Sequence, residues 1–273
     1  MKFSAAVLSS ALLASTALAA PLTAKRAARR AARLEGRSVQ RQSNPPFKPG
    51  TTEAISLKSG TSEVEYSSNW AGAVLIGTGY TAVTAKFTVP TPSTPSGGKS
   101  SEEYCASAWV GIDGDTCDTA ILQTGVDFCV EGSKVSYDAW YEWYPDYAYD
   151  FSGITISAGD VISVTVDASS KTAGTATIEN ETTGTTVTHT FSGGVDGDLC
   201  EYNAEWIVED FEEGDSLVAF ADFGTVVFSD AVATSGSSSV GPSGATIMDI
   251  ESDSGSILTS VSTTSSSVTV KYV

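Results

Sequence analysis

The chain has 273 residues, with 15 Lys or Arg against 33 Asp or Glu, and a formal net charge of −18 at pH 7. The charges are divided unevenly: residues 1–60 carry a net +8 and residues 61–273 a net −26. The acidic part has no basic patch that could neutralise phosphates, so a nucleic-acid partner is not expected. No segment after the N-terminus approaches the ~18 consecutive apolar residues of a membrane span, so no membrane partner is expected either.

The N-terminal part of the sequence has the pattern of an export and processing region. An apolar run over residues 5–19 ends in the small-residue pattern Ala17-Leu18-Ala19, which predicts a signal peptide over residues 1–19 and a secreted, extracellular protein. Residues 20–60 are rich in Lys and Arg and then in Pro, which indicates a propeptide. A disordered basic tail is the alternative for this stretch.

The charge difference between the leader and the acidic body predicts how the two interact. A basic leader is attracted to an acidic body at neutral pH, and protonation of the carboxylates weakens that attraction. We therefore expect the propeptide to act as an intramolecular inhibitor that acid releases. Because the mature part has few cations to pair with its many carboxylates, we also expect it to be stable in acid and fragile in mild alkali.

From residue 64 onward the sequence is typical of β-strands. Apolar and polar residues alternate with a period of two, and clusters of Gly, Asp, Asn or Ser separate the segments. Strands are predicted at residues 81–89, 106–112, 136–143, 161–168, 175–179, 185–191, 216–223 and 267–273. Helical periodicity is almost absent. We therefore predict an all-β protein, with one antiparallel β-sandwich domain over residues 61–273 that exists as a monomer.

The stretch from residue 175 to 191 has the pattern of a β-hairpin. Two alternating runs flank the sequence Asn180-Glu181-Thr182-Thr183-Gly184, which is rich in turn-forming residues. Asn180-Glu181-Thr182 is also an acceptor sequence for N-glycosylation. We expect Asn180 to lie at an exposed loop tip.

Four cysteines, Cys105, Cys117, Cys129 and Cys200, lie in the predicted mature region. In an exported chain they predict two disulfides. Sequence alone permits three pairings, and the pairing of Cys117 with Cys129 and of Cys105 with Cys200 is preferred. A zinc site is the rival, but the chain has no C-x-x-C spacing. We expect neither a metal nor a cofactor.

His189 is the only histidine of the chain, and it decides between classes of hydrolase. It lies in a strand pattern, where an outward imidazole is the simplest interpretation, so Ser-His-Asp and Cys-His sites are disfavoured. The H-E-x-x-H signature of metallopeptidases is absent. Carboxylate chemistry remains, although the single Asp253-Ser254-Gly255 sequence does not fit the paired turns of a pepsin-like enzyme.

An aromatic run covers residues 140–151 and begins with Trp140-Tyr141-Glu142-Trp143. It fits a core strand with alternate rings buried, and it also fits a groove for a peptide or a glycan. The run has more aromatic rings than one buried face needs, and exposed rings need a reason. We expect Trp140 and Trp143 to contact substrate. A glycan-binding or glycan-cleaving sandwich and a non-catalytic binding module are the alternative classes.

Long motifs at residues 66–72 (YSSNWAG), 109–115 (WVGIDGD), 121–127 (ILQTGVD) and 204–209 (AEWIVE) resemble the fungal glutamic peptidases, or eqolisins. The resemblance covers nearly all of the mature region. It implies a concanavalin-like sandwich of two bent sheets and an acid endopeptidase that acts on polypeptides and resists pepstatin. It places the catalytic pair at Gln123 and Glu205, and residues that line the cleft at Trp109 and Asp113.

The chemistry of the two side chains supports these roles. Glu205 as a carboxylate can take a proton from water, and as an acid can return it to the leaving nitrogen. The Gln123 amide can donate to the oxyanion and accept from the attacking water without changing its protonation state. Taken singly, Gln123 could be a turn residue, and Glu205 one member of an acidic stretch. Only the joint match of the two motifs identifies them.

Overall fold

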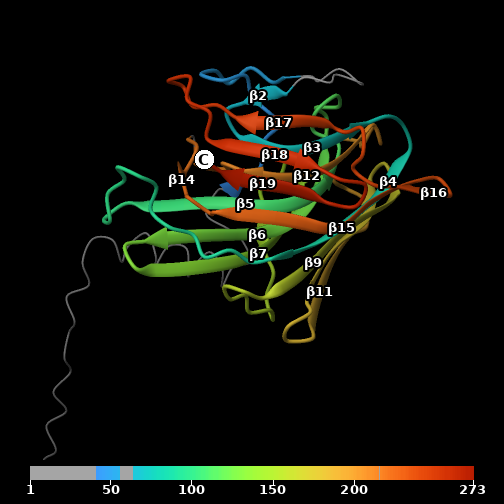
Figure 1. The fold of residues 1–273 in the computed structure, drawn as a ribbon. Helices are drawn as coiled ribbons and strands as arrows, with labels where there is room; N and C mark the ends of the chain where they lie inside the picture. Colours follow the sequence, from blue (N-terminus) through green and yellow to red (C-terminus); the bar gives the residue numbers. More distant parts are fainter. Residues whose placement is uncertain (1–40, 56–63, 215) are drawn as a thin grey trace, which may run out of the picture.

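The computed structural model describes residues 41–55, 64–214 and 216–273. Its regular elements are all β-strands, most of which lie in two large sheets (Figure 1). Among these residues no helix is long and apolar enough to cross a membrane. The expected signal peptide, most of the expected propeptide and the boundary at residues 60 and 61 lie outside the described residues.

The first large sheet has eight strands. Its path runs β11-β10-β9-β4-β15-β19-β18, with β16 paired to β15, and all its pairs are antiparallel. Its strands are β4 (Tyr80–Thr88), β9 (Val161–Ser170), β10 (Ala173–Asn180), β11 (Thr185–Phe191), β15 (Thr225–Ser235), β16 (Ser238–Val240), β18 (Thr259–Thr263) and β19 (Val268–Tyr272).

The second large sheet has nine strands in the path β2-β17-β3-β12-β5-β6-β7-β8, with β14 paired to β5. The pairs β2–β17 and β5–β14 are parallel and the rest antiparallel. Its strands are β2 (Glu65–Ser67), β3 (Trp70–Ile76), β5 (Glu103–Ile112), β6 (Ile121–Glu131), β7 (Lys134–Tyr144), β8 (Tyr149–Asp150), β12 (Asn203–Glu209), β14 (Ala219–Phe220) and β17 (Thr246–Ile250).

On the central strands of the nine-stranded sheet, side chains point alternately into the main core and toward the opposite face, which carries the candidate site. On β5, β6 and β12 the even-numbered apolar residues, such as Val110, Phe128 and Trp206, belong to the main core cluster, together with Phe87 and Val164 of the other sheet. Since successive side chains point to opposite faces of a strand, the odd-numbered residues face away from this core. All the candidate catalytic residues on these strands are odd-numbered and therefore share that second face.

The structure confirms a β-sandwich and corrects two expectations about its elements. The predicted strand at 216–223 is reduced to the two residues of β14 and isolated bridges. The β10–β11 hairpin is confirmed, with Asn180 paired to Thr185. However, Asn180 is fully buried and its Nδ2 donates to the Thr155 carbonyl at 3.0 Å and to Asp160 Oδ2 at 2.8 Å. The expectation of an exposed Asn180 is therefore wrong.

The disulfide pairing preferred from the sequence is also wrong. The bridges join Cys105 to Cys129 and Cys117 to Cys200. Cys105 and Cys129 are direct partners in the β5–β6 ladder, with their Cα atoms 4.1 Å apart. Cys117 precedes β6 and Cys129 lies near its far end, so the strand itself holds these two apart. Because the four sulfurs form two disulfide bonds, the cysteines are not zinc ligands.

Residues 41–55, from the end of the expected propeptide, pack against the nine-stranded sheet. Strand β1 (Arg41–Gln42) forms a two-stranded antiparallel sheet with β13 (Glu212–Glu213). The backbone carbonyl of Asn44 accepts a hydrogen bond from Trp70 Nε1 at 2.9 Å, and Phe47 N–H donates to Asn69 Oδ1 at 2.8 Å. This segment lies on the face of the sheet that points away from the main core.

Candidate active site

The two expected catalytic residues lie in one row across the nine-stranded sheet. Glu205 on β12 is paired with Gly111 on β5, Gly111 with Gln123 on β6, and Gln123 with Glu142 on β7. Gln123 and Glu205 are thus two strand spacings apart, about 10 Å at the backbone. Gly111 leaves the space between them free of a side chain, so the long side chains of Gln and Glu can approach each other above it.

Glu205 is a buried carboxyl group without a partner. It is fully buried, and neither Oε1 nor Oε2 has a hydrogen-bond partner among the described residues. Burial, with added repulsion from Asp113 and Asp115, raises the pKa of Glu205 well above its ordinary value. A buried carboxyl group without hydrogen-bond partners lowers stability and is rare in folded proteins. Such groups, with strongly shifted pKa values, are typical of functional sites.

Gln123 is in a similar position. Its side chain is fully buried and its Oε1 has no hydrogen-bond partner among the described residues. Its Nε2 donates to the backbone carbonyl of Ser43 at 3.5 Å. The amide therefore donates to a peptide carbonyl oxygen and keeps its own oxygen free as an acceptor.

Two tryptophans form the row next to the catalytic one. Trp109 on β5 pairs with Gly125 on β6, and Gly125 with Trp140 on β7. Both indole rings are fully buried. Trp109 Nε1 donates to Glu209 Oε2 at 2.9 Å, and Trp140 Nε1 donates to Ser107 Oγ at 3.1 Å. A Cβ at Gly125 would lie 2.5 Å from the Cβ of Trp109 and 2.9 Å from its Cα, so a side chain at this position would clash with strand β5.

Further carboxyl groups surround these rows. Burial raises the pKa of Glu142 well above its ordinary value and that of Glu209 to about 7, although the charge of Arg41 opposes both shifts. Burial, with Glu209 as the second cause, also raises the pKa of Asp210 well above its ordinary value. The site is therefore built from carboxyl groups that hold their protons at acid pH.

Comparison with known proteins decides the family of this arrangement. The model of the Peptidase A4 family matches residues 68–272. The chain belongs to the peptidase A4 family. It is 66% identical to aspergillopepsin-2 of Aspergillus niger over the whole of both chains. It is 48% identical to scytalidopepsin B of Scytalidium lignicola over 88% of each chain.

Solved structures give the same result for this A4 peptidase. The crystal structure of scytalido-glutamic peptidase with a transition state analog inhibitor matches with a TM-score of 0.69 and 46% identity, over 76% of this chain and 98% of that one. Aspergilloglutamic peptidase from Aspergillus niger matches with a TM-score of 0.61 and 75% identity, over 62% and 99%. The protein is thus a glutamic peptidase of the eqolisin family, a hydrolase that acts on polypeptides.

Asp113 supports the backbone next to Glu205 in this A4 peptidase. Its carboxylate accepts four backbone N–H groups at 2.7 to 3.1 Å, from Cys200, Glu201, Tyr202 and Asn203. These residues lead directly into β12. Asp113 therefore fixes the start of the strand that carries Glu205, and its oxygens are occupied by the backbone.

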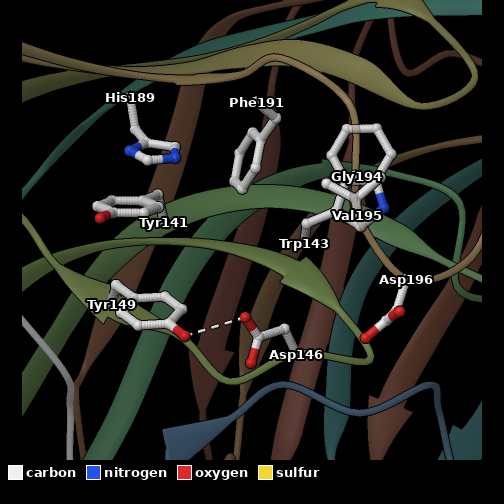
Figure 2. A pocket seen from close by; sticks show the side chains of 9 residues that line it. All are labelled: Tyr141, Trp143, Asp146, Tyr149, His189, Phe191, Gly194, Val195 and Asp196. Atoms are coloured by element: carbon white, nitrogen blue, oxygen red, sulfur yellow. Dashed lines mark hydrogen bonds between the residues drawn. The ribbon is translucent and has the colours of Figure 1, made fainter.

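Trp143 lies on the other face of the sheet from Trp140. It belongs to the main core cluster and donates from Nε1 to the Gly197 carbonyl at 3.2 Å. There it lines a pocket of about 300 Å³ with Tyr141, Tyr149 and Phe191 (Figure 2). The structure brings Trp109 and Trp140, but not Trp143, to the face that carries Gln123.

The same pocket contains the only histidine. His189 on β11 stacks on the ring of Tyr141 with centroids 3.9 Å apart (Figure 2). Burial lowers the pKa of its imidazole. Because Tyr141 alternates with Glu142 on β7, His189 and the catalytic row lie on opposite faces of that strand.

Several residues of the site were not identified from the sequence. Glu142 lies inside the aromatic run and was not singled out there, although it alternates with Trp140 on the face of Gln123. Asp127 ends the motif at residues 121–127, and the motif alone does not indicate its contact with Arg41. The role of Gly111 could not be predicted from the sequence. Its position between Gln123 and Glu205 follows from the β5–β6 and β5–β12 strand registers.

Proposed function

We propose that this A4 peptidase is a secreted acid endopeptidase in which Glu205 activates water and Gln123 stabilises the tetrahedral intermediate. The observation that carries the proposal is the row Glu205–Gly111–Gln123. In it, both oxygens of a buried carboxyl and the oxygen of a buried amide lack hydrogen-bond partners among the described residues. The match to the structure of a glutamic peptidase with a transition state analog inhibitor supports peptide hydrolysis as the reaction.

The proposed reaction needs no group beyond these two side chains and water. Ionised Glu205 takes a proton from water as the water oxygen bonds to the peptide carbonyl carbon. The carbonyl π electrons move to oxygen, and the Gln123 Nε2–H group donates to the resulting oxyanion. Protonated Glu205 then gives its proton to the amide nitrogen as the C–N bond breaks. A raised pKa keeps the proton available for delivery in the second step. In acid the first step uses the small ionised fraction of Glu205, which the raised pKa makes a stronger base.

The proposed protein is made as an inactive precursor, with residues 20–60 as propeptide and intramolecular inhibitor, and acts as a monomer after acid activation. The position of residues 41–44 supports inhibition. Ser43 N–H donates to both oxygens of Glu142 at 3.3 and 3.2 Å, and Asn44 N–H donates to Glu209 Oε1 at 3.3 Å. Together with the Gln123 contact to Ser43, these bonds hold leader backbone against the catalytic row, which supports inhibition by the leader.

The test is hydrolysis of acid-denatured haemoglobin at pH ~3 in the presence of pepstatin. The full chain is secreted and matured in acid, and inactive variants are matured by a trace of tagged wild-type enzyme that is then removed. We expect wild type to be active and Gln123→Ala to lose about 10² to 10³ in kcat, the usual loss for one oxyanion donor. A folded Gln123→Ala enzyme with wild-type kcat, or an enzyme active on polysaccharide and not on protein, would refute the proposal.

A further inference from the structure

A pocket of about 300 Å³ lies where an edge of the nine-stranded sheet meets an edge of the eight-stranded sheet. Five of its lining side chains are rings: Tyr141, Trp143, Tyr149, His189 and Phe191 (Figure 2). They come from β7, β8 and β11, on the face of β7 opposite the catalytic row. The volume is at the lower end of the range for small-molecule sites, about 300 to 1,000 Å³. The pocket therefore fits a single ring-sized group.

The rings support one another and form one wall of the pocket. The imidazole of His189 lies parallel to the Tyr141 ring, with centroids 3.9 Å apart, and Tyr149 is stacked on Tyr141 at 5.8 Å. Phe191 is turned edge-on to His189 at 4.6 Å and is tilted against Trp143 at 5.3 Å. Stacked and edge-on pairs are the preferred arrangements of aromatic rings. Because each ring is held by another, the wall is formed before a ligand binds, which lowers the entropic cost of binding.

The opposite wall is the loop after β11, and it is also held in place. This loop carries Val195 and Asp196 into the lining of the pocket. The Gly197 carbonyl accepts a hydrogen bond from Trp143 Nε1 at 3.2 Å. A Cβ at Gly197 would clash with the Thr119 carbonyl, so the loop packs closely against the segment before β6. Both walls are therefore preformed, as is usual for small-molecule sites.

The polar groups of the pocket are two carboxylates at its mouth. Asp146 and Asp196 are exposed and lie on the side away from His189 and Phe191 (Figure 2). Asp146 Oδ2 accepts a hydrogen bond from Tyr149 Oη at 3.0 Å, which fixes the orientation of this carboxylate. Each carboxylate oxygen has two lone pairs and can accept a further hydrogen bond from a ligand. The pocket thus has an aromatic side and an acceptor side.

We propose that this pocket is a sugar-binding site that takes one neutral hexose ring between the aromatic wall and the carboxylates of Asp146 and Asp196. A hexose has an apolar face of C–H groups, which packs on the electron-rich face of an aromatic ring. Its hydroxyl groups point outward from the ring and can donate to carboxylates. Two carboxylates repel an anion, and a purely apolar ligand would leave them without a partner. The site is separate from the proposed catalytic pair and does not depend on it.

The position of His189 favours a neutral sugar over an organic cation. The ordinary pKa of histidine is about 6.5, and burial lowers that of His189. In acid the imidazole becomes a cation in the wall of the pocket, while Asp146 and Asp196 lose negative charge as they protonate. A cationic ligand would therefore lose its attraction under acid conditions. A neutral sugar has no net charge to be repelled, and its hydroxyl groups can still bond to a protonated carboxyl.

The experiment uses His189 as the reporter. It is the only histidine of the chain, so its imidazole C–H signals in an NMR spectrum need no assignment and report directly on this pocket. The purified protein is titrated with methyl β-D-glucopyranoside, with methyl α-D-mannopyranoside and, as the cationic probe, with tetramethylammonium chloride. The pH is held at ~5.5, where the aspartates are ionised because their reference pKa is about 3.9.

Two variants test the two sides of the pocket. Asp196→Ala removes one acceptor, and Asp198→Ala is its matched control, because Asp198 is an exposed aspartate of the same loop that does not line the pocket. Phe191→Leu keeps an apolar side chain and removes the ring, and its thermal midpoint shows whether it is folded. Asp196→Ala decides the proposal if Phe191→Leu does not fold, since an exposed loop residue is not needed for the core.

We expect at least one of the two glycosides to shift the His189 signals with a Kd of about 1 mM, the affinity usual for a ligand of about 13 non-hydrogen atoms. Asp196→Ala should raise this Kd about tenfold, as for loss of a hydrogen bond to a charged group, and Asp198→Ala should match wild type. Phe191→Leu should raise it about three- to tenfold. The glycoside should leave peptide hydrolysis unchanged.

Four results would overturn the proposal. The first is a His189 signal that neither glycoside moves, and the second is a Kd that is the same in wild type, Asp196→Ala and folded Phe191→Leu. The third is a saturable shift with tetramethylammonium and none with the glycosides, which would make the pocket a cation site. The fourth is competitive inhibition of peptide hydrolysis by the glycoside, which would place the sugar in the catalytic cleft.

Discussion

Gly111 is the residue on which the geometry of the catalytic pair depends. A Cβ at this position would lie 2.9 Å from Trp109 Cζ3 and 3.4 Å from both the Gln123 Cβ and Glu205 Oε2. The indole would have to move, and the methyl group would lie between Gln123 and Glu205, where the proposed reaction needs the water and the peptide carbonyl. A displacement of about 1 Å in a catalytic group can cost about 10² in rate.

We therefore expect Gly111→Ala to lower kcat/KM by about 10² and to leave the fold intact. Gly77→Ala is the matched control, because its Cβ would meet Tyr80 Oη at a similar 3.0 Å and Gly77 lies between β3 and β4, outside the catalytic row. Both variants are compared by peptide hydrolysis at acid pH and by thermal midpoint. The expectation fails if the two variants lose activity equally, or if Gly111→Ala is as active as wild type.

At the scale of elements, the two disulfides stabilise the molecule to different extents. The Cys105–Cys129 bridge closes a separation of 24 residues between adjacent strands, and Cys117–Cys200 closes one of 83 residues. By chain entropy, the first is worth about 3 to 4 kcal/mol and the second about 4 to 5 kcal/mol. The second bridge also holds Cys200, whose N–H is bound by Asp113.

We expect replacement of Cys117 and Cys200 by Ala to destabilise the protein more than replacement of Cys105 and Cys129 by Ala. It should also lower kcat, because it loosens the turn that leads to Glu205. Denaturant unfolding at pH ~4 gives the two free energies, and peptide hydrolysis gives the activities. A larger stability loss from the Cys105 and Cys129 pair would contradict this ranking.

The strands in which apolar and polar residues alternate could be predicted from the sequence. The features that depend on which strands pair with each other could not. Strands such as β9 and β11 have a period of two, because one face of each strand is more buried than the other. Strand β12 is buried on both faces, so its sequence does not alternate clearly, and it was identified only as a motif. The disulfide partners and the Gly111 spacing depend on which strands become neighbours, which periodicity does not encode.

The proposed catalytic pair was predicted from long motifs rather than from a physical pattern. Gln123 and Glu205 are 82 positions apart in the sequence, and only the sheet order β12-β5-β6 brings them into one row. Trp143 shows the opposite case. It was expected in the cleft with Trp140, but an odd separation of three residues on one strand places the two rings on opposite faces.

For the whole molecule, buried carboxyl groups predict how stability depends on pH. The pKa values of Glu205, Asp210 and Glu142 are raised well above ordinary, that of Glu209 to about 7 and that of Asp249 to about 6. Carboxyl groups with raised pKa values bind more protons in the folded state than in the unfolded state. Stability is therefore full below about pH 4 and falls as pH rises through about 6 to 7.

We expect the thermal midpoint of the matured enzyme to fall steadily between pH 4 and pH 8. Asp210→Asn should reduce this fall, because Asp210 is buried and its Oδ1 has no hydrogen-bond partner among the described residues. The variant should match wild type at pH 3 and be more stable at pH 7. A midpoint that rises from pH 3 to pH 8 would contradict the account of the whole molecule.

The account of catalysis depends most on the carboxyl of Glu205, because one group is assigned both the removal and the return of a proton. Glutamine has the same shape but can do neither. The decisive measurement is kcat/KM of Glu205→Gln against wild type from pH 2 to pH 6, on enzyme matured in trans and shown to be folded by its thermal midpoint. We predict a loss of about 10³ or more at every pH, whereas a variant within about tenfold of wild type would contradict the assignment.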